Sequence, residues 1–275
     1  MKLVAVASVV SILPIVAVSA AWAGDRRPAE VRGVNFVGNC GFSHRAPDDP
    51  MVAPNRPGAS HDHTFVGNTT TSAFSTLRSL RAGATTCRRP GETAAYWAPT
   101  LLVAGQAVEP AAATIYYRRR TAAHVRAFPQ GFRMIAGSAA ARTAQSLRVT
   151  FWNCGAMAGI RPSSTVPTCP TGRATSLRLH VNFPSCWDGQ RLDSADHQSH
   201  VAYALRGACP STHPVAVPAI SLILRYAVTG GANVELASVG QFSAHADFFN
   251  SWHQGTLARL VNGCLNALRH CGRGS

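Results

Sequence analysis

Apolar and polar residues alternate in several short runs of the chain, as they do in strands that bury one face. The clearest run is SLRLHVNF at 176–183, in which the leucines, valine and phenylalanine fall on one face and arginine, histidine and asparagine on the other. Gly, Pro, Asn or Ser separates most of the runs. Comparable runs are VRGVNFVG, TIYYRRR, QSLRVTFWNC, ISLILRYAV and NVELASVG.

Helical periodicity is scarce. Its best example is the C-terminal NSWHQGTLARLVNGCLNALRH at 250–270, where four apolar residues fit one helix face. A shorter candidate covers roughly residues 73–80, and no fixed-period repeat or convincing linker is present. We therefore expect a mainly β protein: a single β-sandwich or jelly-roll-like domain with long loops, disulfides and a short C-terminal helix.

The N-terminus has the order of a cleaved secretory signal. Lys2 is followed by an apolar run interrupted by Pro14 and then by an Ala-x-Ala triplet that ends at Ala23. The alternative, a membrane anchor, fits the short and proline-broken run less well. We predict a signal peptide at 1–23, an extension at 24–34 and one domain at 35–271. The product should be secreted, without a membrane span, and act as a monomer.

The chain has eight cysteines, all of them beyond the predicted signal. An even number in an exported chain indicates disulfides, and the absence of a CxxC pair argues against a zinc ribbon. Eight cysteines allow 105 pairings, so the sequence alone does not decide among them. The simplest expectation pairs sequence neighbours: Cys40–Cys87, Cys154–Cys169, Cys186–Cys209 and Cys264–Cys271.

The formal net charge is +14, and it falls to +13 without Lys2. Nearly all of the basic residues are scattered arginines, whereas a nucleic-acid-binding chain usually concentrates them in a stripe with interleaved aromatics. We therefore expect no nucleic-acid partner. The charge does favour attraction to acidic polymers outside the cell, such as anionic glycans or wall polymers.

Most candidate chemical groups lie in four polar blocks flanked by Gly, Pro and Cys, which is typical of loops that gather at one place. The first block, SHDHTFVG, carries two histidines that would share a face on a strand. The candidates are His61 and His63; Asp188, Asp193, Asp196, His197 and His200; His213; and His245 and Asp247.

Each block also has a structural interpretation. His61 and His63 could ligate one metal ion or contact one substrate, or they could hydrogen-bond nearby carbonyls. A carboxylate in the second block could orient an imidazole, although Asp188 followed by glycine is also a strong turn signal. His213 is open between both roles. Asp247 could pair with His245 or could cap a helix.

Several known chemistries are excluded because the chain has no GxSxG, HExxH or phosphate-binding loop, and its cysteines are expected to be oxidised. A glycosidase would need two carboxylates at a set separation, which Asp188, Asp193, Asp196 and Asp247 could supply. A lyase for acidic sugars would need a base, an acid and a cation, which His, Asp and Arg could supply.

A series of longer motifs resembles the DUF1996 family of secreted fungal and actinobacterial proteins. The motifs include GASHDHTFVGN, FPQGFRMIAG, NFPSCWDGQRLDSADHQSHVAY, CPSTHPVAVPAI and HADFFNSWHQGTLARLVNGC, over roughly residues 35–271. The segment DDPMVAPNRPGAS departs from the family pattern by extra residues before His61. Members of this family are often joined to carbohydrate-binding or wall-associated modules, so the resemblance implies work on polysaccharides.

Three hypotheses follow. The first is a secreted hydrolase or lyase of extracellular or wall polysaccharide, in which the four blocks form one cleft and the Asp and His residues named above are catalytic or orienting groups. The second is a non-catalytic carbohydrate- or wall-binding protein. The third is an extracellular copper or zinc protein with a divalent metal on His61, His63 and a distant histidine. Substrate contacts would come from Trp97, Trp187, Asp188, His213 and Trp252, with the three tryptophans exposed for stacking on sugars.

Overall fold

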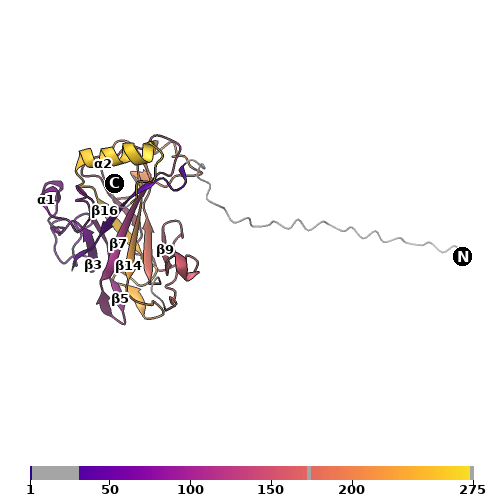
Figure 1. The fold of residues 1–275 in the computed structure, drawn as a ribbon. Helices are drawn as coiled ribbons and strands as arrows, with labels where there is room; N and C mark the ends of the chain where they lie inside the picture. Colours follow the sequence, from indigo (N-terminus) through magenta and orange to yellow (C-terminus); the bar gives the residue numbers. More distant parts are fainter. Residues whose placement is uncertain (2–30, 172–174, 273–275) are drawn as a thin grey trace.

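The computed structural model describes residues 1, 31–171 and 175–272 (Figure 1). The predicted signal peptide, apart from Met1, and residues 24–30 of the predicted extension lie outside the described residues. Two five-stranded antiparallel sheets make up most of the fold. The first has the order β1 (Asn35–Cys40), β7 (Pro110–Arg118), β14 (Ala219–Tyr226), β10 (Arg178–Asn182) and β9 (Thr150–Asn153). The second has the order β2 (Phe42–Ala46), β3 (His63–Gly67), β4 (Ala95–Pro99), β16 (His245–Phe249) and β8 (Arg133–Gly137).

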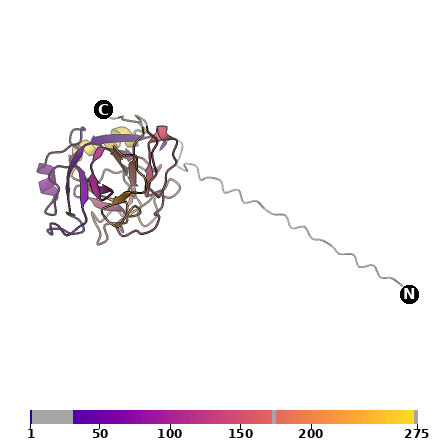
Figure 2. The same cartoon turned by 90° about the horizontal axis from the view of Figure 1, so that it is seen from below.

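The two large sheets pack through their inner faces. Because side chains alternate along a strand, every second residue points into one shared core. Tyr117 and Leu222 come from the first sheet, and Tyr96 and Phe248 from the second, and all four are buried in the same cluster. Figure 2 looks along the strands and shows the layers. The prediction of a mainly β sandwich is confirmed.

Smaller elements extend this sandwich. A short helix, α1 (Leu77–Ala82), begins after Thr76, whose side-chain oxygen accepts a hydrogen bond from the Ser79 amide. The helix therefore starts later than the predicted residue 73. One three-stranded sheet has the order β12 (Val201–Ala202), β11 (Cys186–Trp187) and β13 (Val215–Ala216); the other has β15 (Val234–Leu236), β5 (Leu101–Val103) and β6 (Gln106–Val108). The helical segments are α1 (Leu77–Ala82), a 3-10 turn (Ala156–Ala158), α2 (Gln254–Leu260) and a π-helical turn (Val261–Asn266).

All four predicted disulfides are present, each between neighbours in the sequence: Cys40–Cys87, Cys154–Cys169, Cys186–Cys209 and Cys264–Cys271. No free cysteine remains among the described residues. The described helices also include none with the length and apolar character needed to cross a membrane.

The C-terminal helix is confirmed, and it leads the chain back to the first strand. After the π-helical turn, Cys264 is tied to Cys271. The Cys271 amide then donates to the Asn35 carbonyl at 2.9 Å, and His270 forms a β-bridge with Asn35. The last described residues therefore lie against β1, the first strand of the fold.

A polar network crosses the shared core. Glu92 is fully buried and accepts a hydrogen bond from the Tyr96 hydroxyl at 3.1 Å. The Tyr96 hydroxyl is also hydrogen-bonded to the Tyr117 hydroxyl, which accepts a second hydrogen bond from the Trp252 indole at 2.8 Å. Burial raises the pKa of Glu92 to about 8, against the hydrogen bond from Tyr96 and the charge of Arg89. The carboxyl group is therefore largely protonated at neutral pH.

Candidate metal centre

The outer face of the second sheet carries a cluster of histidine and aspartate. His63 begins β3 and His245 begins β16, on either side of β4. Asp247 follows two residues after His245, so both point to the same face. In the strand register His63 lies opposite Pro99, and Asp247 lies opposite Trp97.

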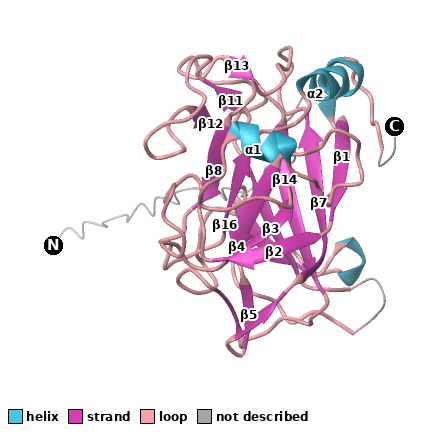
Figure 3. Ribbon diagram, turned by 90° about the vertical axis from the view of Figure 1, so that its left-hand side faces the viewer, coloured by secondary structure: helices cyan, strands magenta, loops and turns pink. Residues whose placement is uncertain are grey.

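This outer face is covered, although it lies outside the main core. A second apolar cluster there includes Phe65, Trp97 and Phe249 from the strands, Met51 from the loop at 47–62, and Leu80 from α1. Figure 3 shows α1 in front of the strands of this sheet. The cover explains why His63, His245 and Asp247 are at most 3% exposed.

Backbone carbonyls orient two of the imidazoles. His63 Nδ1 lies 3.0 Å from the Asp48 carbonyl oxygen, and His245 Nδ1 lies 2.8 Å from the Ser243 carbonyl oxygen. A carbonyl only accepts, so each Nδ1 carries the proton and donates. Each Nε2 is thereby left with its lone pair, which is the form in which histidine binds a metal ion.

His61 completes a group of three imidazoles. Its ring centroid is 4.2 Å from that of His63 and 5.1 Å from that of His245, and the His63 and His245 centroids are 5.8 Å apart. One ring nitrogen from each of the three lies within 4.8 Å of the other two. His61 is only half-buried, so the cluster borders solvent on this side.

Two carboxylates lie beside the imidazoles. One oxygen each of Asp49 and Asp247 lies within 4.8 Å of the other and of a nitrogen of His63. Asp49 Oδ1 accepts from the backbone amides of Met51 and Val52 at 2.8 and 2.9 Å. Asp247 is fully enclosed, and burial together with the charge of Asp49 raises its pKa well above its usual range.

Several of these buried polar atoms have no hydrogen-bond partner among the described residues. They are His61 Nε2, His63 Nε2, Trp97 Nε1 and both oxygens of Asp247. An unsatisfied buried polar group costs about 1–3 kcal/mol. The Trp97 indole N–H is only a donor, but the two imidazole nitrogens and the two carboxylate oxygens are four potential ligand atoms on one patch, which is a strong indication of a missing ligand. A cation would satisfy the nitrogen and carboxylate lone pairs together.

The donor set favours a first-row transition metal. Three imidazole nitrogens and a carboxylate suit zinc, copper, iron or manganese, whereas magnesium and calcium prefer oxygen ligands alone. Burial, together with the charge of a neighbouring histidine, lowers the pKa of both His63 and His245 to about 3. Both imidazoles are consequently neutral and ready to ligate at physiological pH.

A glycine gives His245 its position. Gly137 on β8 lies opposite His245 and has φ +85°, and a Cβ there would lie 2.4 Å from the Ala244 carbonyl oxygen. Gly105 has a similar φ of +77° but nothing within 4 Å of a Cβ.

We therefore expect Gly137→Ala to lower the free energy of unfolding by about 3 kcal/mol and to weaken metal binding, because β16 must shift. Gly105→Ala should cost only about 1 kcal/mol and leave metal binding unchanged. Denaturant unfolding and metal titration of both variants check this, and equal losses in the two would contradict the steric argument.

A second polar group lies beside the first. His197 Nδ1 is 2.7 Å from Asp193 Oδ1, and Asp193 Oδ2 is 3.6 Å from Arg133 Nη1. The hydrogen bond that His197 donates to Asp193 raises the pKa of His197, and the charges of Asp193 and Asp49 raise it further. The His197 carbonyl accepts from the Ile135 amide, and Ile135 pairs with Asp247 across the sheet. The dyad and the cluster are therefore neighbours.

The remaining predicted polar residues form local structure. His200 is fully buried, with Nε2 2.7 Å from the Arg133 carbonyl oxygen and Nδ1 2.8 Å from Ser194 Oγ. Asp196 accepts from the amides of Gln198 and Ser199, as expected for a turn.

Asp188 and His213 hold neighbouring turns. Asp188 accepts from the amides of Gln190 and Arg191 and pairs with the Arg191 guanidinium at 2.7 Å. His213 ties its loop to the Ser199 carbonyl at 3.1 Å. All four residues have structural partners and lie outside the histidine cluster.

The prediction of exposed tryptophans is wrong. Trp97 and Trp252 are fully buried and Trp187 is only 5% exposed. The Trp252 indole donates a hydrogen bond to the Tyr117 hydroxyl, and the Trp187 indole donates one to the Arg191 carbonyl. Their size and one polar atom let them fill the interior, so none of the three can stack on a sugar from solvent.

Sequence reasoning missed Asp49. The only signal was the pair of aspartates before Pro50, in the segment that departs from the family pattern. The helix-cap alternative for Asp247 is also excluded, because Asp247 lies within β16.

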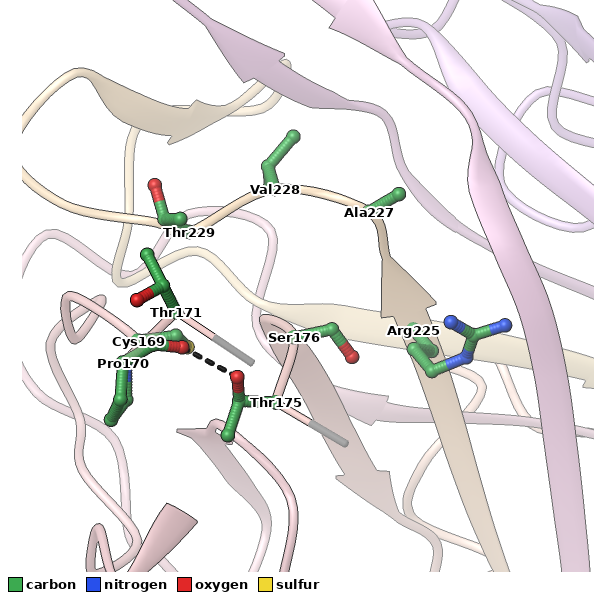
Figure 4. Close-up of a pocket in the computed structure, with 9 residues that line it drawn as sticks. All are labelled: Cys169, Pro170, Thr171, Thr175, Ser176, Arg225, Ala227, Val228 and Thr229. Carbon is green, nitrogen blue, oxygen red and sulfur yellow. Dashed lines mark hydrogen bonds between the residues drawn. The ribbon is translucent and has the colours of Figure 1, made fainter. Parts of the chain in front are cut away.

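A separate hollow of about 350 Å³ lies at the end of β14 (Figure 4). Among the residues that line it Arg225 is the charged one, and the others are apolar, hydroxyl-bearing or disulfide-bonded. The hollow offers no imidazole or carboxylate and is not a second ligand set.

Comparison with known proteins gives one positive result. A family model described as "Domain of unknown function (DUF1996)" matches residues 49–252, which is more than half of the chain. No curated protein and no solved structure matches the chain. The match is shorter than the predicted 35–271 but includes Asp49, His61, His63, His245 and Asp247. The chain therefore belongs to the DUF1996 family.

Proposed function

We propose that this is a secreted metal-dependent enzyme that holds a divalent transition metal on His61, His63, His245 and Asp247. Zinc is the metal that we propose first. Two groups of potential ligands that share His63 carry this proposal: the three imidazoles of His61, His63 and His245, and the set Asp49, His63 and Asp247, in which both Asp247 oxygens have no partner among the described residues. Carbonyl bonds that fix both Nδ1 protons support it, because such outer contacts are typical of metal-binding histidines.

The open side of the cluster favours catalysis over a purely structural metal. A structural zinc site is shielded from solvent, whereas a catalytic site keeps a position for water or substrate, which zinc with four protein ligands can accept as a fifth ligand. His61 borders solvent, and the His197–Asp193 dyad lies next to the cluster. Zinc in such a site would lower the pKa of bound water. His197, with its Nδ1 proton held by Asp193, would exchange a proton through Nε2.

The substrate class in this proposal is an extracellular or wall polysaccharide, cleaved by hydrolysis or elimination. Four disulfides are compatible with an extracellular location. The association of the family with carbohydrate-binding modules supports the substrate class. A purely binding role is less well supported, because the tryptophans that would have formed its platform are buried.

Metal analysis of the purified protein tests the metal site. We expect about one zinc per chain after zinc supplementation, and a loss of affinity of at least about 100-fold in His63→Ala. His253→Ala is the matched control, since His253 is exposed and its side chain does not cap α2. Absence of bound zinc, copper, iron or manganese after supplementation would refute the site, as would wild-type affinity in His63→Ala.

A screen of neutral and acidic polysaccharides tests the activity. Wild type should release products from at least one of them, and His63→Ala should not. Product released equally by wild type and His63→Ala would show that the activity does not depend on the metal site. A bound metal without any product would leave the metal site standing and overturn the enzymatic proposal.

A further inference from the structure

The five strands of the first sheet carry cationic side chains on their outer face. The strands β1, β7, β14, β10 and β9 contain no aspartate or glutamate. Three arginines alternate outward from them instead: Arg118, Arg178 and Arg225. These cations are far apart in the sequence, and the strand pairing brings them onto one surface.

Two of the arginines face each other directly. Arg178 of β10 is the cross-strand partner of Arg225 of β14. Like charges in this position destabilise a sheet. The other neighbours of the pair, Asn153 and Ala112, bring no negative charge, and Arg178 Nε is buried without a hydrogen-bond partner among the described residues. An anion bound between the two guanidinium groups would remove this cost.

Aromatic rings lie in the next two outward-facing rows of the sheet, first Phe151 with His180 and then Tyr116. Phe151 and His180 are cross-strand partners whose rings stack with centroids 4.2 Å apart. Tyr116 lies under the Arg118 guanidinium, 4.2 Å from its ring centroid. Flat rings beside cationic groups suit a chain of sugars that carry carboxylates, because sugar faces pack on rings while arginine binds carboxylate in a two-pronged contact.

The electrostatics of His180 agree with this arrangement. Burial, together with the charges of Arg178 and Arg118, lowers the pKa of His180 to about 3. The charges of both guanidinium groups thus act on the ring. The arginines keep their positive charge on this face even with His180 neutral.

We propose that the outer face of the first sheet binds an acidic polysaccharide of the polyuronate type, with Arg178 and Arg225 contacting its carboxylates and Phe151 and Tyr116 packing on its sugar rings. The face lies on the opposite side of the sandwich from the histidine cluster, because the two sheets pack through their inner faces. It therefore acts as an anchor, and it does not depend on the metal site.

Binding of the full chain to polygalacturonate tests the proposal. The Arg178→Gln/Arg225→Gln double variant should weaken binding at least about 10-fold. The matched control, Arg78→Gln/Arg142→Gln, removes the same charge from two exposed positions outside the first sheet and should change binding less than about twofold. Fully methyl-esterified polygalacturonate lacks the carboxylates, so it should bind neither the wild type nor the double variant. Circular dichroism confirms that both variants are folded.

Equal weakening in the double variant and the control would overturn the proposal, because it would show attraction by net charge alone. Unchanged binding in Phe151→Ala and Tyr116→Ala would contradict the role of the rings. Single-stranded RNA bound more tightly than polygalacturonate, with the same dependence on Arg178 and Arg225, would reassign the face to nucleic acid.

Discussion

Replacing Asp247 by valine should stabilise the metal-free protein and at the same time abolish metal binding. Asp247 is fully buried, neither of its oxygens has a partner among the described residues, and its pKa is raised well above the usual range by burial and by Asp49. Such a group costs about 1–3 kcal/mol, which an apolar side chain suited to a strand would recover. The same change removes the enclosed carboxylate ligand.

Thermal unfolding in a chelator and in zinc measures both effects. We expect Asp247→Val to have a higher Tm than wild type in chelator and to lose the rise in Tm that zinc gives the wild type. Asp188→Ala is the control with the opposite pattern, because it breaks a turn that three hydrogen bonds hold. It should lower Tm and keep the response to zinc. A destabilised Asp247→Val that still responds to zinc would contradict the assignment.

The second large effect concerns pH. The pKa of Glu92 is about 8 in the fold, against an ordinary value of 4.5. The folded state therefore holds a proton that the unfolded chain releases between these values. The stability that protonated Glu92 contributes to the fold is fully present below about pH 4.5 and is lost as pH rises through 8. Glu92→Gln keeps the shape without the charge, so it should be more stable than wild type at pH 9, by a difference on the order of 4 kcal/mol.

Unfolding of wild type and Glu92→Gln across pH 4.5 to 9 tests this prediction. The two should converge at the acidic end and separate above neutral pH, so that effects of other titrating groups cancel. Glu235→Gln is the control, since Glu235 is exposed on β15. Parallel curves for wild type and Glu92→Gln would show that the carboxyl group is not buried as a neutral acid.

The sequence was sufficient for the parts of the fold that depend on local pattern. Alternation in SLRLHVNF predicts β10, and the apolar face after Trp252 predicts the C-terminal helix. Nearest-neighbour pairing predicts the disulfides because the loops they close are short compared with the chain. The boundary of α1 was missed because Thr76 and Ser79 cap each other, which sets the first turn.

The candidate site was predicted only in part. The HDH spacing and the HAD spacing place His61, His63, His245 and Asp247 among the candidates, and the pairing of β3 and β16 with β4 brings them together. Asp49 could not be found in this way, because its position follows from how the loop at 47–62 folds over the sheet.

Burial and charge were the other points that local pattern could not settle. Sequence does not distinguish a tryptophan that lies on a surface from one that fills a core, which is why Trp97 and Trp252 were misplaced. Scattered arginines also gave no sign of a basic surface, because Arg178 and Arg225 are 47 positions apart and become neighbours only through strand register.

The contact of Cys271 and His270 with Asn35 has an architectural consequence. A fold whose first strand and last residues touch can be spliced into a loop of another protein, or carry neighbours on both ends, without disturbing its own sheets. Segments joined directly to Asn35 and to Cys271 would leave the sandwich at the same corner.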